Sequence, residues 1–243
     1  MSVAVIIAAA GSGERLGAGA PKALRTVGGI PILVHAVREM TQATLVDFVV
    51  VAVPMGAVHT VSELLHTHLG DADTLRVIEG GANRQESVAK ALDVLPPEVD
   101  VVLVHDAARP LAPSALADAV ARVVLTGHGA VVPAVAMTDT VKRVGAVSTD
   151  DPETVIETVA RVDLRCVQTP QGFDRGVLVK AHAAADDGAA VTDDAGLVER
   201  LGLPVVVVPG SDLAFKITRP FDLTVAEAVV AARAAARSAD DVG

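Results

Sequence analysis

The sequence is poor in aromatic residues. Trp and Tyr are absent, and Phe occurs four times among 243 residues. Proteins that bind single-stranded nucleic acid stack the bases on aromatic rings, so the composition disfavours that class. A formal net charge of −10 also disfavours a polyanionic polymer, although a local cluster of Arg and Lys can still bind a small anion. We therefore expect no nucleic-acid partner.

Cysteine and long apolar runs are equally scarce. Cys166 is the only cysteine, which excludes a disulfide within the chain and suits a reducing compartment. We expect it to be a buried structural thiol, because nothing nearby in the sequence would activate it. No uninterrupted apolar run approaches the length of a membrane span, and the chain enters its first strand without a basic leader. These features predict a cytoplasmic protein with no membrane partner.

What the chain does have is a small, glycine-containing loop close to its start. The segment AAAGSGERLG (residues 8–17) follows an apolar run at residues 3–7, and Pro21 and Lys22 close it. Small residues allow backbone amides to approach a ligand closely, and Arg15 and Lys22 add two positive charges. A strand that leads into such a loop predicts a polyphosphate site, and a solvated turn is the alternative.

Two better-known phosphate loops do not fit these residues. The dinucleotide fingerprint G-x-G-x-x-G requires glycine where Leu16 stands, and it requires an acid near the end of the second strand, where the chain has Ala52-Val53-Pro54. A Walker loop requires Gly-Lys-Ser/Thr, whereas Lys22 lies between Pro21 and Ala23. A guanidinium and an ammonium seven residues apart remain, and this pair suits a triphosphate.

Strand and helix patterns alternate along most of the chain. Buried strands are predicted at 3–7, 48–53, 75–78, 99–104, 130–135 and 204–208, and helices at 31–40, 57–68, from 84, at 113–125, at 175–186 and from 220. This alternation predicts one α/β domain over residues 1–243, with a doubly wound, mostly parallel, three-layer sheet. Ligands of such sheets bind outside the carboxyl ends of the strands, so the first loop and residues 105–110 can share a pocket.

The alternation breaks at about residues 138–160. Two β-like pieces, at 140–144 and 154–157, flank a polar turn at 148–152. The pattern predicts a hairpin that projects from the sheet as an arm.

Several polar residues near the predicted strand ends are candidates for chemistry. Asp106 could hold Mg²⁺ or ribose hydroxyls, or could simply cap a turn, and Arg109 could bind a phosphate or be surface charge. His105 is expected to have a hydrogen-bonded structural role. Thr192 lies at a predicted helix start, where amides and a hydroxyl suit a phosphate, and Lys216 stands among apolar neighbours before the last helix.

Taken together, the motifs resemble one family. AAAGSGERLG with PK, GG…RQESV, VHDAARP, DTVK, TPQGF, TDDA and KITRP occur in the order found in the 2-C-methyl-D-erythritol 4-phosphate cytidylyltransferases of the non-mevalonate isoprenoid pathway. The resemblance runs from Val3 to about Ala231. It implies a nucleotide-diphospho-sugar transferase-like fold, and a reaction of CTP with the polyol phosphate, in the presence of Mg²⁺, that gives the cytidine diphosphate alcohol and pyrophosphate.

The resemblance also assigns roles to residues. It implies catalytic roles for Arg15, Lys22, Arg161 and Lys216. Nucleotide binding is implied for Ala8, Ala9, Ala10, Gly11, Ser12, Gly13, Gly81, Ser87, Asp106 and Ala107, with Asp106 also at the metal. Substrate binding is implied for Arg109, Thr140, Arg161, Thr169, Thr192 and Lys216.

The arm resembles the dimerisation arm of the family, which implies a homodimer in which Arg161 reaches the substrate phosphate of the other subunit. The chain departs from the family pattern at Ala82, where an acid is often found, and at Ala160, where Asp usually precedes the arginine. Two alternative functions remain open from the sequence: a ribitol 5-phosphate cytidylyltransferase, and a nucleotide-binding regulator without catalysis.

Overall fold

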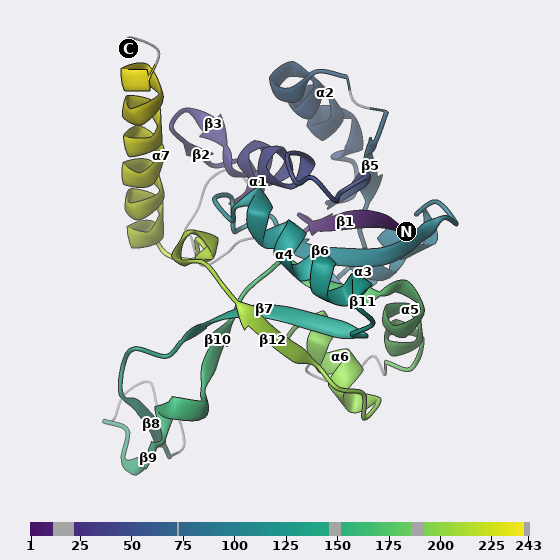
Figure 1. The fold of residues 1–243 in the computed structure, drawn as a ribbon. Helices are drawn as coiled ribbons and strands as arrows, with labels where there is room; N and C mark the ends of the chain where they lie inside the picture. The colour runs from purple at the N-terminus through teal and green to yellow at the C-terminus, as the bar shows by residue number, and fades with distance from the viewer. Residues whose placement is uncertain (12–21, 72, 146–151, 186–191, 241–243) are drawn as a thin grey trace.

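The computed structural model describes residues 1–243 apart from 12–21, 72, 146–151, 186–191 and 241–243. In this part of the chain the main sheet has eight strands, in the order β10-β7-β11-β6-β1-β4-β5 with β12 beside β7 (Figure 1). Their bounds are β1 (Ser2–Ala8), β4 (Phe48–Val53), β5 (Leu75–Glu79), β6 (Val99–Asp106), β7 (Ala130–Ala136), β10 (Arg165–Val167), β11 (Gln171–Asp174) and β12 (Val206–Pro209).

Most of these strands are parallel, as predicted. β1 pairs in parallel with β4 and β6, β4 with β5, and β12 with β7. The exceptions are β10, which is antiparallel to β7, and β11, which lies antiparallel between β6 and β7. The sequence did not predict β11, because its four residues contain one large apolar side chain, Phe173, and show no strand-like alternation.

Helices lie between most of the strands, close to where the sequence predicts them. Their bounds are α1 (Ile32–Thr41), α2 (Val58–Leu69), α3 (Arg84–Asp93), α4 (Ser114–Leu125), α5 (Arg175–Ala183), α6 (Asp194–Arg200) and α7 (Pro220–Asp240). Short elements complete the described chain: η2 (Lys22–Leu24), β2 (Thr26–Val27), β3 (Ile30–Pro31), η3 (Arg161–Asp163) and η4 (Asp212–Ala214). Helix α5 ends at Ala183, three residues before its predicted end.

The sheet is covered on both faces, which makes the fold doubly wound with three layers. Because side chains alternate along a strand, Val5 and Ile7 of β1 pack in one core with α1, α2 and α4. Ala4 and Ile6 of the same strand pack in a second core with α3, α5 and α6. All four side chains are buried, so both faces of this central strand contribute to the stability of the fold.

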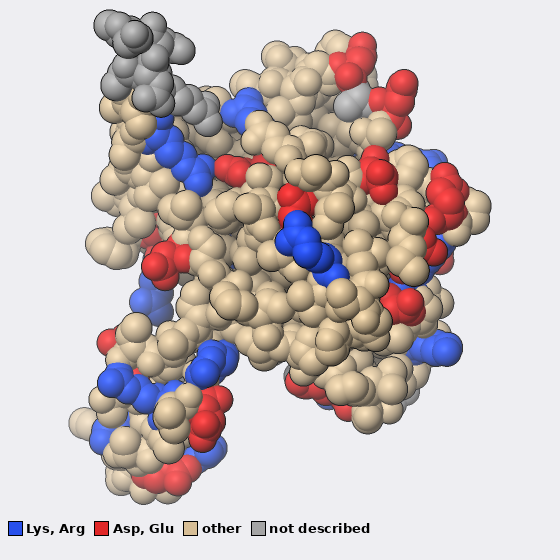
Figure 2. Space-filling model, in the orientation of Figure 1, with Lys and Arg blue, Asp and Glu red and all other residues tan. Residues whose placement is uncertain are grey.

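The predicted arm is present as a separate hairpin, in which β8 (Val141–Val144) pairs antiparallel with β9 (Val155–Val159). Figure 1 shows the hairpin projecting away from the main sheet. Of the predicted turn at 148–152, residues 148–151 lie outside the described residues. Figure 2 shows positively and negatively charged side chains side by side on the arm. Arg143 of β8 and Glu157 of β9 form an ion pair.

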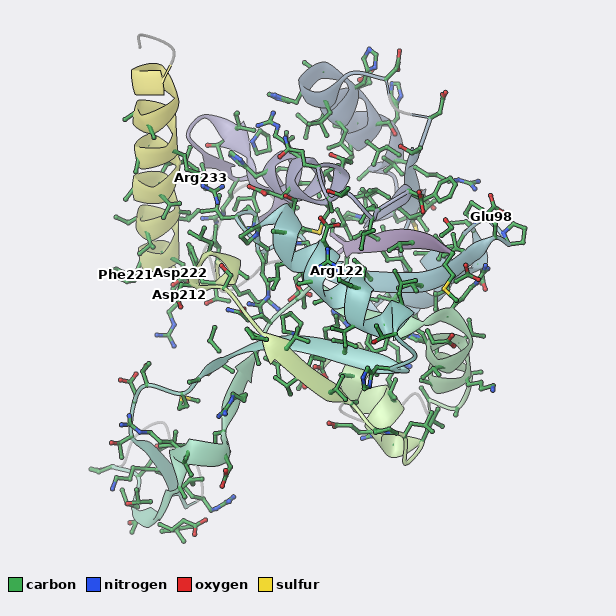
Figure 3. The ribbon with its side chains drawn as sticks, viewed as in Figure 1. Glu98, Arg122, Asp212, Phe221, Asp222 and Arg233 are labelled. Carbon is green, nitrogen blue, oxygen red and sulfur yellow. The ribbon has the colours of Figure 1, made fainter. Side chains whose placement is uncertain are left out.

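Helix α7 forms one side of the molecule (Figure 1). Arg233 attaches it to α1 through a contact of 2.9 Å from Nη1 to Glu39 Oε1, and the Gly28 amide donates to Glu227 at 2.8 Å. Figure 3 shows Phe221 and Asp222 at the start of this helix, and Phe221 is 73% exposed. The helix predicted from residue 220 is therefore confirmed. No described helix combines the length and apolar content of a membrane span.

Cys166 is less buried than the sequence predicts. It lies in β10, beside β7, and is half-buried, with its Sγ 3.7 Å from Met137 Sδ. The strand is at the margin of the sheet and leads out of the arm, so one side of the residue stays accessible.

Candidate active site

The candidate site lies where β1 and β6 end side by side. Ala8 and Asp106 are partners in the parallel register, and the Ala107 amide donates to the Ala8 carbonyl at 3.3 Å. A hollow opens at these strand ends. The predicted nucleotide-binding residues in its lining are Ala8, Ala9, Ala10, Gly11, Ser87, Asp106 and Ala107. The shared pocket expected from the two loops is therefore present.

Gly80 and Gly81 bring the main chain close to this hollow. A Cβ on Gly80 would lie 2.7 Å from Ser87 Oγ and 2.9 Å from Ala10 Cβ, so a side chain there would clash. The Gly81 amide donates to Ser87 Oγ at 3.0 Å. Helix α3 starts immediately afterwards, and Asn83 caps it by accepting from the Glu86 amide at 2.8 Å, as the sequence predicts.

Asp106 is the electrostatic centre of the site. Its side chain is 11% exposed, Oδ2 accepts from Lys216 Nζ at 2.8 Å, and Oδ1 accepts from Arg84 Nε at 3.3 Å. Burial disfavours the carboxylate, but the charges of Arg84 and Lys216, with Arg109 beside them, outweigh it and hold the pKa of Asp106 well below its usual range. Asp106 is therefore ionised throughout the physiological pH range.

A second hollow lies on the other side of Asp106. The predicted substrate-binding residues in its lining are Arg109, Thr169, Thr192 and Lys216. Lys216 was predicted at a strand end, but it lies in an irregular segment between η4 and α7, and its side chain is 39% exposed. Lys216 lines both hollows, and a hydrogen bond from the Ile217 amide to the Ala108 carbonyl at 2.8 Å ties its segment to the residues that follow β6.

Arg109 lines the second hollow, and its guanidinium contacts backbone carbonyl groups there. Its Nη1 donates to the Ala214 carbonyl at 2.6 Å and its Nη2 donates to the Val167 carbonyl at 3.4 Å. Its Nε lies 3.7 Å from Asp106 Oδ2, and burial lowers the pKa of this guanidinium. The arginine thus ties its own segment to those of Val167 and Ala214 around the second hollow, and its contact with a phosphate stays a prediction.

His105 and Thr169 form a buried chain of hydrogen bonds beneath Asp106. The Asp106 amide donates to Thr169 Oγ1 at 3.0 Å, and Thr169 Oγ1 lies 3.0 Å from His105 Nδ1. His105 Nε2 lies 3.2 Å from the Arg109 carbonyl, which can only accept, so Nε2 carries the proton and Nδ1 accepts from Thr169. This arrangement agrees with the structural role expected of His105. It also directs the Thr169 hydroxyl inward, to position Asp106.

The remaining predicted residues lie apart from the two hollows or outside the described chain. Thr140 and Arg161 are exposed on the arm, where Arg161 Nη1 donates to the Thr138 carbonyl. Ser12, Gly13 and Arg15 lie outside the described residues, and Lys22 begins η2. The catalytic assignments of Arg15, Lys22 and Arg161 therefore stay predictions.

Two side chains at the centre of the site were missed by the sequence analysis. Arg84 lines both hollows, and its Nη1 donates to Asp194 Oδ2 at 2.6 Å. Asp194 is 1% exposed and also contacts His182 Nε2 at 2.9 Å. Burial opposes the Asp194 carboxylate, but Arg84 and His182 more than offset it and lower its pKa. The sequence held a signal for Arg84, since it is the first residue of a helix that follows Gly80-Gly81.

Among the described residues, no group of three or more His, Cys, Asp or Glu side chains could hold a metal ion. Of the carboxylates in this part of the chain, Asp106 is the one that lines both hollows, and its two oxygens accept from protein cations. Mg²⁺ sites with one or two carboxylates obtain their other ligands from water and substrate phosphates. The residues present therefore suit an ion that arrives with a polyphosphate, and they do not form a closed protein site.

Comparison with known proteins gives a consistent result. The family model for IspD, 2-C-methyl-D-erythritol 4-phosphate cytidylyltransferase, matches residues 3–232. The enzyme of that name from Streptomyces coelicolor is 55% identical over 232 residues, which cover 95% of this chain and 85% of the relative. The crystal structure of the Thermus thermophilus enzyme is 37% identical with a TM-score of 0.74, and covers 94% of this chain and 98% of that one. The crystal structure of the 4-diphosphocytidyl-2C-methyl-D-erythritol synthase from Anaerococcus prevotii is similar with a TM-score of 0.78 at 28% identity. The match covers 94% of this chain and 96% of that one.

Proposed function

We propose a division of labour within the active site from the premise that the chain belongs to the 2-C-methyl-D-erythritol 4-phosphate cytidylyltransferase family. As a member of this family, it transfers the cytidylyl group of CTP to 2-C-methyl-D-erythritol 4-phosphate, and the products are 4-diphosphocytidyl-2-C-methyl-D-erythritol and pyrophosphate. The first hollow holds CTP and the second holds the polyol phosphate. The observation that carries this assignment is that Asp106 and Lys216 line both hollows, so two ligands would meet beside them.

The nucleotide is bound mainly by main-chain groups. Ala8, Ala9, Ala10 and Gly11 line the first hollow, and Ser12 and Gly13, which follow them in the sequence, would also bind the nucleotide. Main-chain groups near Ala9, Ala10 and Gly81 would accept from the amino group of cytosine, and Ser87 and Ala107 line the same hollow. UTP lacks that donor and would leave a buried acceptor unpaired, at a cost of about 1–3 kcal/mol.

The reaction needs charge neutralisation more than it needs a base. A phosphate oxygen of the polyol phosphate attacks the α-phosphorus of CTP in line, and pyrophosphate leaves. The second pKa of a phosphate monoester is about 6, so this nucleophile is already deprotonated near neutral pH. Arg15 and Lys22 would stabilise the triphosphate, and Lys216 would align the incoming phosphate, because positioning and electrostatics dominate such transfers.

Mg²⁺ enters this proposal as a companion of CTP. Its oxygen ligands would be the triphosphate and the Asp106 carboxylate, and it would supply further neutralisation of phosphate charge. Asp106 also lies where ribose hydroxyls would be bound. Both roles use the exposed part of a carboxylate that Arg84 and Lys216 already orient.

The arm supports a homodimer in the proposal. Val155, Ile156 and Val162 are 52%, 64% and 73% exposed on it, and burying such side chains against a second copy is favourable. Arg161 of the partner subunit, with Thr140 beside the arm, would then complete the polyol-phosphate site. A single cytidylyltransferase domain in the cytoplasm, with Cys166 reduced, completes the proposed description.

The test is release of pyrophosphate on mixing the protein with Mg²⁺, one nucleotide and one polyol phosphate. CTP with 2-C-methyl-D-erythritol 4-phosphate should give the fastest release, with the cytidine diphosphate alcohol identified by mass spectrometry. Ribitol 5-phosphate and UTP serve as matched substitutes for each substrate. Equal kcat/KM for CTP and UTP would contradict the proposed base recognition, and equal kcat/KM for the two alcohols would contradict the assignment of the second hollow.

A further inference from the structure

Arg84 lines both substrate hollows, and the proposed function so far uses it only to orient Asp106. Of the described residues, the side chains of Arg84, Asp106 and Lys216 contribute to both linings. Arg84 is the first residue of α3, and its side chain is 29% exposed. Its guanidinium lies between two carboxylates, with Nη1 2.6 Å from Asp194 Oδ2 and Nε 3.3 Å from Asp106 Oδ1.

Three cations stabilise the Asp106 carboxylate, and they differ in how close they lie and in what else they bind. Lys216 Nζ contacts Oδ2 at 2.8 Å. Arg109 lies farther away, with Nε at 3.7 Å and both Nη groups bound to backbone carbonyls. Arg84 is the cation on the other oxygen, Oδ1.

A phosphate bound in the second hollow would compete with Asp106 for Lys216. Asp106 is 11% exposed, and a carboxylate at that depth is strongly destabilised when it loses its counter-ions. In the absence of CTP and its Mg²⁺, the condition under which the polyol-phosphate Kd is measured, transfer of Lys216 from Asp106 to a phosphate is therefore favourable only if another cation stays with Asp106. Asp194 binds the other end of the Arg84 guanidinium, so Arg84 is held where it can stay paired with Asp106.

We infer that Arg84 is a positioning residue that remains paired with Asp106 and thereby releases Lys216 to bind the polyol phosphate. The inference rests on the proposed function, in which Lys216 contacts that phosphate. The inference requires that loss of Arg84 weaken binding of the polyol phosphate more than binding of CTP. Without Arg84, Lys216 would stay with Asp106 and would not be available to the polyol phosphate.

The test measures binding and turnover in the full chain for Arg84→Met, Arg84→Lys and, as a matched loss of positive charge, Arg122→Met. Arg122 is exposed on α4 (Figure 3). Calorimetry gives the Kd of 2-C-methyl-D-erythritol 4-phosphate, and steady-state assays give KM and kcat. Arg84→Met should raise Kd and KM for the polyol phosphate about tenfold, with a change of less than about threefold for CTP, and Arg84→Lys should restore most of the affinity. Circular dichroism checks that each variant is folded.

A double-mutant cycle with Asp106→Asn separates this role from a purely structural one. When the Asp106 charge is absent, Lys216 has no carboxylate to leave, so Arg84→Met should change the polyol-phosphate Kd by less than about threefold in that background. An unreduced effect there, or an Arg84→Lys variant as weak as Arg84→Met, would overturn the inference. Failure of the proposed function is a different result, because the unmodified chain would then release no pyrophosphate from CTP and 2-C-methyl-D-erythritol 4-phosphate.

Discussion

His105 should make the fold sensitive to mild acid. Its side chain is fully buried, and burial is the main reason that its pKa is lowered from 6.5 to about 4, with Arg109 adding to the effect and Asp106 opposing it. A proton on Nδ1 would also face Thr169 Oγ1, which already accepts from the Asp106 amide. The folded state therefore keeps His105 neutral at pH values where the unfolded chain protonates it.

The sign and size of the effect follow from proton linkage. Between pH 6.5 and about 4 the unfolded state binds more protons at this site than the folded state, so the free energy of unfolding falls as the pH is lowered. The difference between the two pKa values corresponds to about 3 kcal/mol, lost progressively across that window. Asp106 adds no loss in this window, because its folded pKa is lowered and its contribution disappears only at more acidic pH.

The measurement is urea unfolding followed by circular dichroism at several pH values, since the chain has no Trp or Tyr for fluorescence. His105→Gln is the control, because its amide can still donate to the Arg109 carbonyl but does not titrate. His35, whose pKa burial also lowers, titrates in both proteins and cancels in the difference. The free energy of unfolding of the unmodified chain, minus that of the His105→Gln variant, should fall by about 3 kcal/mol from pH 7 to pH 4. A difference that stays constant with pH would refute the reasoning.

Three further predictions concern catalysis and packing. Lys22→Ala and Arg15→Ala should each lower kcat by about 10², since both cations would stabilise charge that grows in the transition state, and pyrophosphate release measures this. Lys216→Ala should raise KM for the polyol phosphate about tenfold or more while KM for CTP changes less, which varying one substrate at a time will show. Gly172→Ala should lower the free energy of unfolding by about 1–3 kcal/mol in urea, because its Cβ would lie 2.6 Å from Val120 Cγ1 in α4.

Elements with a strong periodic or terminal signal were predictable from the sequence. Phe48–Val53 is a strand with the predicted bounds because six consecutive apolar residues end at a proline, and Asn83 caps α3 as its side-chain chemistry suggests. β11 was missed, since its pairing between β6 and β7 comes from tertiary contacts and not from its own four residues. The strand length at Asp106 was likewise underestimated, because parallel pairing with β1 continues past the apolar run.

The site shows the same division. Residues in recognisable motifs, such as Ser87, Asp106 and Lys216, line a common hollow. Directions of side chains were not predictable, because they depend on partners distant in sequence. Arg109 turns toward carbonyl groups from two remote segments, and Arg84 acquires its importance from Asp194, which is 110 residues away.

The arm has a consequence for local folding equilibria. Its strands β8 and β9 pair with each other and, within the described chain, form a sheet separate from the main one. An isolated two-stranded hairpin is marginally stable in water, so amide hydrogens of Val141–Val144 and Val155–Val159 should exchange with solvent much faster than those of β1 when subunits are dilute. Association would protect them by mass action. If the proposed dimer forms through the arm, hydrogen exchange in the arm should slow as protein concentration rises, while exchange in β1 stays constant. The concentration at which exchange changes would then report the dissociation constant of that proposed dimer.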